Sequence, residues 1–156
     1  MIAATPRVDV RIVRLRPMQV AAVRATGRAP EIEAWRKLRS WAEPQGLLDR
    51  HPVYGFSNPG PAPDRDEYGY EYWLPVDRPA GQRASSDPVE WKHFDGGLYA
   101  VTTTRLTDVG ETWNDLWDWA KQHGYQTRRT HELEEIRNPT SSDGGLEVDL
   151  YLPIQG

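Results

Sequence analysis

The feature that most constrains how this chain can fold is an internal repeat. When the sequence is laid on itself with an offset of 78 residues, half its length, matching residues coincide in widely separated segments. The coinciding pairs are Trp35 with Trp113, Leu38 with Leu116, Trp41 with Trp119, Ala42 with Ala120, Gly46 with Gly124, Leu74 with Leu152, Pro75 with Pro153, and Ala22-Val23 with Ala100-Val101. One offset shared by such distant segments predicts two copies of one supersecondary unit.

Each copy has the pattern strand, strand, helix, strand, strand, which predicts an α+β fold. The repeats cover about residues 8–78 and 88–156 of a single domain spanning residues 1–156. Alternating apolar residues predict the strands. The strand segments are 8–15, 19–26 and 70–76 in the first copy, and 89–94, 98–104 and 147–154 in the second. Antiparallel sheets are expected to form a groove, with the helices on the opposite side.

The first helix is expected to begin near Pro30, because proline suits the first turn of a helix. Its predicted apolar stripe is Ile32, Trp35, Leu38 and Ala42.

The second helix is expected to begin at Asp108, with Glu111 completing a capping box. Its predicted stripe is Trp113, Leu116, Trp117 and Ala120, and Gly124 ends it in a left-handed conformation.

The two closing strands carry candidate site residues on the face that the helices should leave uncovered. Strand alternation places Glu71 with Trp73, and Asp149 with Tyr151, opposite the apolar residues of their strands. An aromatic cleft with carboxylates suits a flat, lipophilic and often cationic ligand. The same residues also fit a plain solvent-facing strand surface, and the sequence leaves both interpretations open.

Composition excludes several classes of protein. The chain has no cysteine, so disulfide scaffolds and thiol nucleophiles are excluded. The N-terminus lacks the apolar core of a secretory signal and no segment is apolar enough to span a membrane, so we expect a cytoplasmic protein without a membrane partner. The four histidines show no metal-binding spacing, and no phosphate-binding loop is present. We therefore expect neither a metal nor a cofactor.

Several segments together resemble one known family. They are the tandem repeat, the GLYAV strand at 97–101, the EIRNP segment at 135–139 and the closing VDLYLPI strand at 148–154. Across residues 8–155 the chain resembles the GyrI-like small-molecule-binding domain family, the effector-binding domain of AraC- and MerR-type multidrug-responsive regulators. The resemblance implies two strand–helix units with antiparallel sheets side by side and a drug-sized pocket in the groove.

The resemblance also implies a pocket glutamate on the strand before the last. Glu135 is the simplest match to the family pattern, and Glu134 is the runner-up. Because side chains alternate along a strand, only one of the two can face the groove. The predicted ligand-binding set is Glu135, Glu71, Trp73, Tyr99, Asp149 and Tyr151.

Three functions compete at this stage. The first is a stand-alone binding protein for lipophilic, aromatic small molecules, cations included, in a groove between the two repeats. The second, implied by hydrolases in the family, opens strained cyclopropane-type rings: Glu135 would be catalytic and activate water, while Tyr99, Trp73 or Tyr151 orients the substrate. The third is a protein-binding inhibitor module. With seven residues before the first strand and only two after the last, we expect a stand-alone member that does not bind nucleic acid directly.

Overall fold

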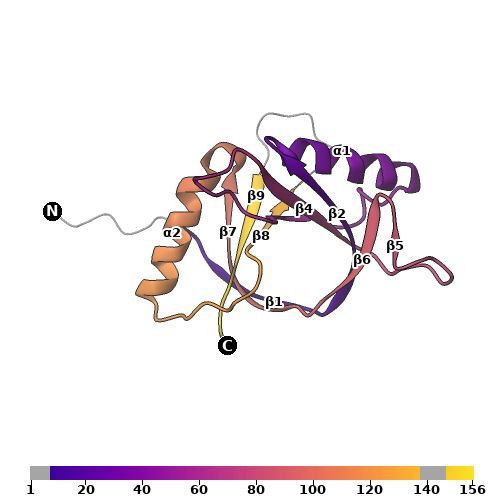
Figure 1. Ribbon diagram of the computed structural model, residues 1–156. Coiled ribbons are helices and arrows are strands. Elements are labelled where there is room, and N and C mark those ends of the chain that lie inside the picture. The colour runs from indigo at the N-terminus through magenta and orange to yellow at the C-terminus, as the bar shows by residue number, and fades with distance from the viewer. Residues whose placement is uncertain (1–7, 138–146) are drawn as a thin grey trace. The chain divides into compact units, whose positions relative to one another are not determined.

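The computed structural model describes residues 8–137 and 147–156 and divides into two compact units (Figure 1). The central unit comprises residues 17–95. The terminal unit comprises residues 8–16 together with the described residues from 96 to 156. Each unit is an antiparallel sheet with one long helix, so the predicted α+β class is confirmed.

The central unit contains a sheet in the order β3-β4-β2-β6-β5. All of its pairings are antiparallel, and α1 packs against β2 and β4. Its elements are β2 (Met18–Gly27), α1 (Pro30–Ala42), η1 (Glu43–Gln45), β3 (Tyr54–Ser57), β4 (Tyr68–Pro75), β5 (Ser85–Ser86) and β6 (Val89–Phe94).

The terminal unit contains a sheet in the order β1-β7-β9-β8, again antiparallel, with α2 packed against β7 and β9. Its elements are β1 (Arg11–Leu15), β7 (Gly97–Arg105), η2 (Leu106–Asp108), α2 (Val109–Gln122), β8 (Leu133–Ile136) and β9 (Glu147–Pro153).

The two sequence repeats exchange their first strands. Strand β1 comes from the first repeat but pairs with β7 of the second, and β6 comes from the second repeat but pairs with β2 of the first. Each unit therefore combines strands of both repeats, and the two units do not coincide with residues 8–78 and 88–156.

Strand register corrects one detail of the repeat alignment. Arg24 lies opposite Glu71, and Thr103 lies opposite Asp149, so Arg24 and Thr103 occupy equivalent positions. The offset between Arg24 and Thr103 is 79 residues, one more than the offset of 78 that aligns Ala22-Val23 with Ala100-Val101. Small apolar residues satisfy either alignment, and only the cross-strand hydrogen bonds distinguish the two registers.

Helix α1 begins at Pro30, as predicted, but it buries a different stripe. Its buried residues are Pro30, Ala34, Leu38 and Ala42. Ile32 is 73% exposed, so its assignment to the core was wrong. The buried positions recur every four residues, which selects one narrow ridge of the helix and turns Ile32 toward solvent.

Helix α2 departs from prediction at two points. Asp108 makes no side-chain capping hydrogen bond, because it is the last residue of the 3-10 turn η2 and has a ψ of 8° instead of the extended conformation of an N-cap. Trp117 is 43% exposed and does not belong to the core. Leu116 and Ala120 are buried, and Gly124 has the predicted left-handed conformation, with a φ of 76°.

The core of the terminal unit lies between α2 and one face of its sheet. Val148, Leu150 and Leu152 of β9 and Ile154 just after it pack there, as their alternation in the sequence predicts. Ala100 of β7 and the buried residues of α2 complete this core. None of the helices formed by residues 8–137 and 147–156 is long and apolar enough to cross a membrane.

Candidate functional site

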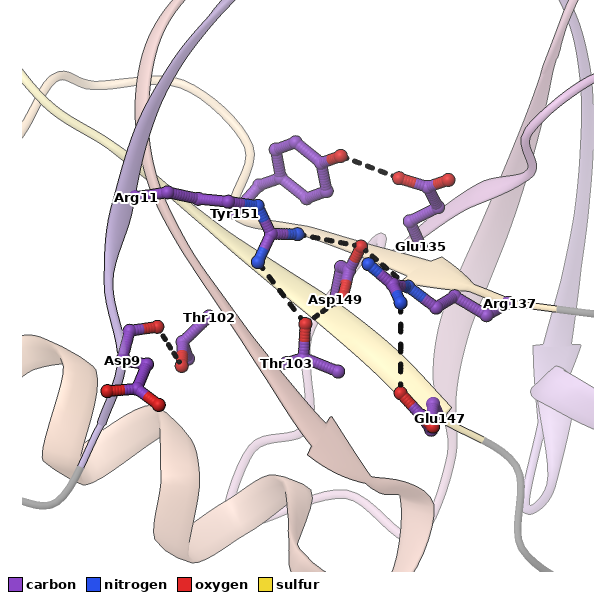
Figure 2. Close-up of polar contacts among 9 residues, drawn as sticks. All are labelled: Asp9, Arg11, Thr102, Thr103, Glu135, Arg137, Glu147, Asp149 and Tyr151. Atoms are coloured by element: carbon purple, nitrogen blue, oxygen red, sulfur yellow. Dashed lines mark hydrogen bonds and ion pairs between the residues drawn. The ribbon is translucent and has the colours of Figure 1, made fainter.

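The opposite face of the terminal sheet carries a cluster of polar side chains (Figure 2). Asp149 and Tyr151 of β9 share this face, because they alternate with the core residues of the strand. Glu135 of β8 and Thr103 of β7 both lie directly opposite Asp149 in the strand register. These three strands belong to the second repeat, and β1 of the first repeat adds Arg11 to the same face.

Asp149 is buried at 3% exposure, and two guanidinium groups and one hydroxyl contact its carboxylate. Its Oδ2 accepts hydrogen bonds from Arg11 at 3.0 Å and from Arg137 at 3.1 Å, and its Oδ1 accepts one from Thr103 at 2.6 Å. Figure 2 shows the two guanidinium groups converging on this carboxylate. Asp149 therefore joins three strands, and the interpretation of this residue as a solvent-facing strand residue was wrong.

Glu135 forms a short hydrogen bond with Tyr151. The phenolic oxygen of Tyr151 donates to Oε1 of Glu135 at 2.6 Å. Burial raises the pKa of the Glu135 carboxyl above its ordinary value; the hydrogen bond from Tyr151 opposes this rise, and the negative charge of Asp149 adds to it. A carboxyl with a raised pKa can exchange protons nearer neutral pH than a free glutamate can.

Strand alternation separates Glu134 from Glu135. Glu134 lies on the helix side, where its Oε2 accepts a hydrogen bond from Nε1 of Trp113 at 2.9 Å. Glu135, the first choice from the sequence, lies on the face with Asp149 and Tyr151. Asn138 and Pro139, which complete the motif, lie outside the described residues.

Tyr99 of β7 lies on the same face as Tyr151 and contacts its ring. It is fully buried, and its ring lies 5.8 Å from that of Tyr151 in an edge-to-face arrangement. The Arg128 guanidinium lies 5.0 Å from the centre of the Tyr99 ring. Burial raises the pKa of the Tyr99 hydroxyl, although Arg128 partly opposes this.

In the central unit, Glu71 and Trp73 lie together as the sequence predicts. Trp73 donates from Nε1 to Glu71 at 2.6 Å, Lys92 donates at 2.8 Å and Asn58 at 3.0 Å. Glu71 is only 1% exposed, so it too is no solvent-facing residue. Burial alone would raise the pKa of Glu71, but the hydrogen bonds from Lys92, Trp73 and Asn58 outweigh it and hold the pKa below its ordinary value.

Sequence reasoning missed the residues around this pair. Phe56 and Phe94 pack against Trp73, with ring centres at 4.8 and 5.2 Å. Phe56 lies opposite Glu71 in the central unit, and Glu135 lies opposite Asp149 in the terminal unit. At this equivalent position the central unit therefore has an aromatic residue, and the terminal unit has an acid. The short YGFS strand carried the signal for Phe56, since its alternation places Tyr54 and Phe56 on one face.

A cavity of about 440 Å³ opens beside Glu71 within the central unit. Polar and charged residues make up most of its lining, among them Arg24, Asn58, Glu71, Asp87, Glu90 and Lys92. Its size falls in the range of small-molecule sites.

The family model described as the GyrI-like small molecule binding domain matches residues 8–155. The chain belongs to this family. None of the curated proteins matches the sequence.

Solved structures with the same fold include proteins of different kinds. A hydrolase from Listeria innocua has 13% identity and a TM-score of 0.66, with 94% of this GyrI-like chain and 91% of the hydrolase chain covered. SAV2435 bound to tetraphenylphosphonium has 13% identity and a TM-score of 0.63, with coverage of 95% and 94%. The EcmrR C-terminal domain has 9% identity and a TM-score of 0.70, with coverage of 96% and 98%. At these identities the likeness shows the fold alone.

Proposed function

We propose that this GyrI-like domain binds lipophilic, aromatic small molecules, cations included, on the strand face of the terminal unit. The observation that carries the proposal is the pair of Glu135 and Tyr151, which places a half-buried carboxylate against an aromatic ring. Aromatic rings attract flat ligands and cations, and an arriving cation offsets the cost of a partly buried negative charge. The tetraphenylphosphonium bound to SAV2435 is a lipophilic cation and supports this choice.

Binding of tetraphenylphosphonium, measured by isothermal titration calorimetry, tests the proposal. Glu135→Gln is expected to weaken binding of this cation about tenfold, the typical effect of losing one charged contact. Glu134→Gln is the matched control, because it removes the same charge from the neighbouring residue on the helix side. Equal effects of the two variants, or a larger effect of Glu134→Gln, would contradict the proposal.

The sequence also predicts that Trp73, Glu71 and Asp149 help to bind this small molecule. Trp73→Phe keeps an aromatic ring but removes the Nε1 donor to Glu71, so it separates stacking from polar support. We expect Trp73→Ala to weaken ligand binding more than Trp73→Phe. Equal affinities of wild type and Trp73→Ala would remove the central unit from the ligand site.

Hydrolysis of strained, electrophilic rings is the second candidate, favoured by the raised pKa of Glu135 and its contact with Tyr151. Glu135 would take a proton from water as the water oxygen attacks a ring carbon. The carbon–carbon bond then breaks, its electron pair moves to the attached acceptor group, and that group is protonated. The product is the substrate plus one water.

Mass spectrometry of a cyclopropane-bearing electrophile after incubation separates the two candidates. Hydrolysis gives a product heavier by one water, with turnover lost in Glu135→Gln and slowed in Tyr151→Phe. A ligand recovered unchanged, with its affinity reduced in Glu135→Gln, identifies a binding protein instead.

A further inference from the structure

The polar cavity of the central unit has a charge distribution that the chain itself does not neutralise. Glu71 pairs with Lys92 at 2.8 Å. The other charged groups of its lining are Arg24, Asp87 and Glu90. Within the part of the chain that the structure describes, none of these three forms an ion pair or a side-chain hydrogen bond. The cavity thus presents two carboxylates and one guanidinium to whatever enters it.

The internal repeat supplies a second observation. In the central unit, Ala22 of β2 lies between Glu90 of β6 and Trp73 of β4 in the strand register. In the terminal unit, Val101 of β7 lies in the same way between Arg11 of β1 and Tyr151 of β9. Because Trp73 and Tyr151 are equivalent, Glu90 occupies in the central unit the position that Arg11 occupies in the terminal unit.

In the terminal unit this position is occupied by Arg11, whose guanidinium group pairs with groups of the same sheet. Arg11 reaches across the sheet to Asp149 at 3.0 Å and to Thr103 at 3.3 Å (Figure 2). In the central unit the corresponding side chain is a carboxylate, and the cavity lies beside it. Lys92, two residues along the same strand, already neutralises the buried Glu71. Among the side chains that the structure describes, Glu90 has no ion-pair or hydrogen-bond partner.

We propose that this cavity binds a small hydrophilic molecule of the basic amino-acid type. Its guanidinium or ammonium group pairs with Glu90 and Asp87, and its carboxylate pairs with Arg24. A planar guanidinium suits carboxylates because it can donate two parallel hydrogen bonds. On Asp149, Arg11 and Arg137 each donate one hydrogen bond to Oδ2. The cavity is large enough for a free amino acid, and its polar lining does not favour a lipophilic ligand.

Calorimetric titration with three related probes tests the class of ligand. L-Arginine carries both charged ends, agmatine lacks the carboxylate, and L-citrulline replaces the guanidinium by a neutral group of nearly the same shape. We expect L-arginine to bind tightest, agmatine more weakly and L-citrulline at least about tenfold more weakly than L-arginine. The absence of L-arginine binding up to about 10 mM, or equal affinity for L-citrulline, would overturn the proposal.

Variants locate the binding in the cavity. Glu90→Gln is expected to weaken both L-arginine and agmatine about tenfold, whereas Arg24→Gln weakens L-arginine and leaves agmatine unchanged. Glu67→Gln is the matched control, since Glu67 is exposed in the same unit and does not line the cavity. A similar loss in Glu67→Gln would show that net charge alone attracts the ligand, and the proposal would fail.

The charged groups proposed to bind L-arginine differ from the Glu135–Tyr151 pair that carries the proposal for the terminal unit. Glu135→Gln is expected to leave L-arginine affinity unchanged, and Glu90→Gln is expected to leave tetraphenylphosphonium affinity unchanged. If Glu135→Gln also abolished binding of L-arginine, the cavity of the central unit would not be its site. Thermal unfolding of each variant confirms that it is folded before its affinity is compared.

Discussion

At the scale of single residues, the two units place a buried and a half-buried glutamate in opposite electrostatic settings. Glu71 receives three donors, among them the ammonium of Lys92, and its pKa lies below the ordinary value of 4.5. Glu135 receives one donor and faces the charge of Asp149, and its pKa lies above that value. Burial acts in the same direction on both, so the number and charge of the partners decide the outcome.

These opposite shifts predict opposite effects of pH on stability. Glu71 stabilises the folded protein above its unfolded pKa, and that contribution is lost as pH falls through its lower folded pKa. Glu135 stabilises it at low pH, and that contribution is lost as pH rises through its raised folded pKa. We expect Glu71→Gln to cost about 2 kcal/mol at neutral pH, with the cost shrinking in acid. We expect Glu135→Gln to gain stability relative to wild type as the pH rises.

Urea unfolding of both variants and wild type between about pH 3 and pH 8 measures these trends. The relevant quantity is the difference in free energy of unfolding from wild type at each pH. If the difference from wild type changed with pH in the same direction for Glu71→Gln and Glu135→Gln, the assignment of opposite pKa shifts would be contradicted.

At the scale of elements, α2 offers a comparison of one substitution in two conformations. Gly110 lies in the first turn of the helix, and Gly124 lies after its end with a φ of 76°. A Cβ at either position meets nothing within 4 Å, so packing does not distinguish them. Gly110→Ala should stabilise the protein by up to about 1 kcal/mol through helix propensity. Gly124→Ala should destabilise it by about 1 kcal/mol, because only glycine adopts the left-handed conformation without strain. Thermal unfolding reports both signs, and the same sign for both would contradict this account.

The packing face of α2 can be checked in the same way. Leu116 is fully buried, whereas the neighbouring Trp117 is 43% exposed. We expect Leu116→Ala to cost about 3 kcal/mol of unfolding free energy by leaving a cavity. Trp117→Ala removes a larger side chain but should cost less than about 1 kcal/mol. Denaturant midpoints measure the difference, and a greater cost for Trp117→Ala would place the tryptophan in the core.

At the scale of the whole molecule, the exchange of first strands makes each repeat incomplete by itself. A fragment of residues 8–78 lacks β6, whose Lys92 neutralises Glu71 and whose Phe94 packs on Trp73. A fragment of residues 17–95 retains β2 to β6 and α1.

We therefore expect residues 17–95 to unfold cooperatively and residues 8–78 to be largely unstructured. Circular dichroism during heating, with both fragments at equal concentration, measures this. A more cooperative transition in residues 8–78 would mean that the sequence repeat is the folding unit.

Local patterns determine much of this protein before any tertiary structure is known. The repeat, the α+β class, the start of α1 at Pro30, the left-handed Gly124 after α2 and the two faces of the closing strands all follow from local sequence, which depends on neighbours in the chain. The choice of Glu135 over Glu134 required one further fact, the register of β8 against β9.

The tertiary structure decided what lies far apart in the sequence. Strand exchange brings Arg11 to Asp149 and Lys92 to Glu71, and no local pattern indicates these pairs. The exposure of Ile32 and Trp117 depends on which ridge of each helix meets the sheet. Alternation along a strand determines which face a side chain occupies, but only the pairing of strands determines which charges it meets there, and those charges set the chemistry of both proposed sites.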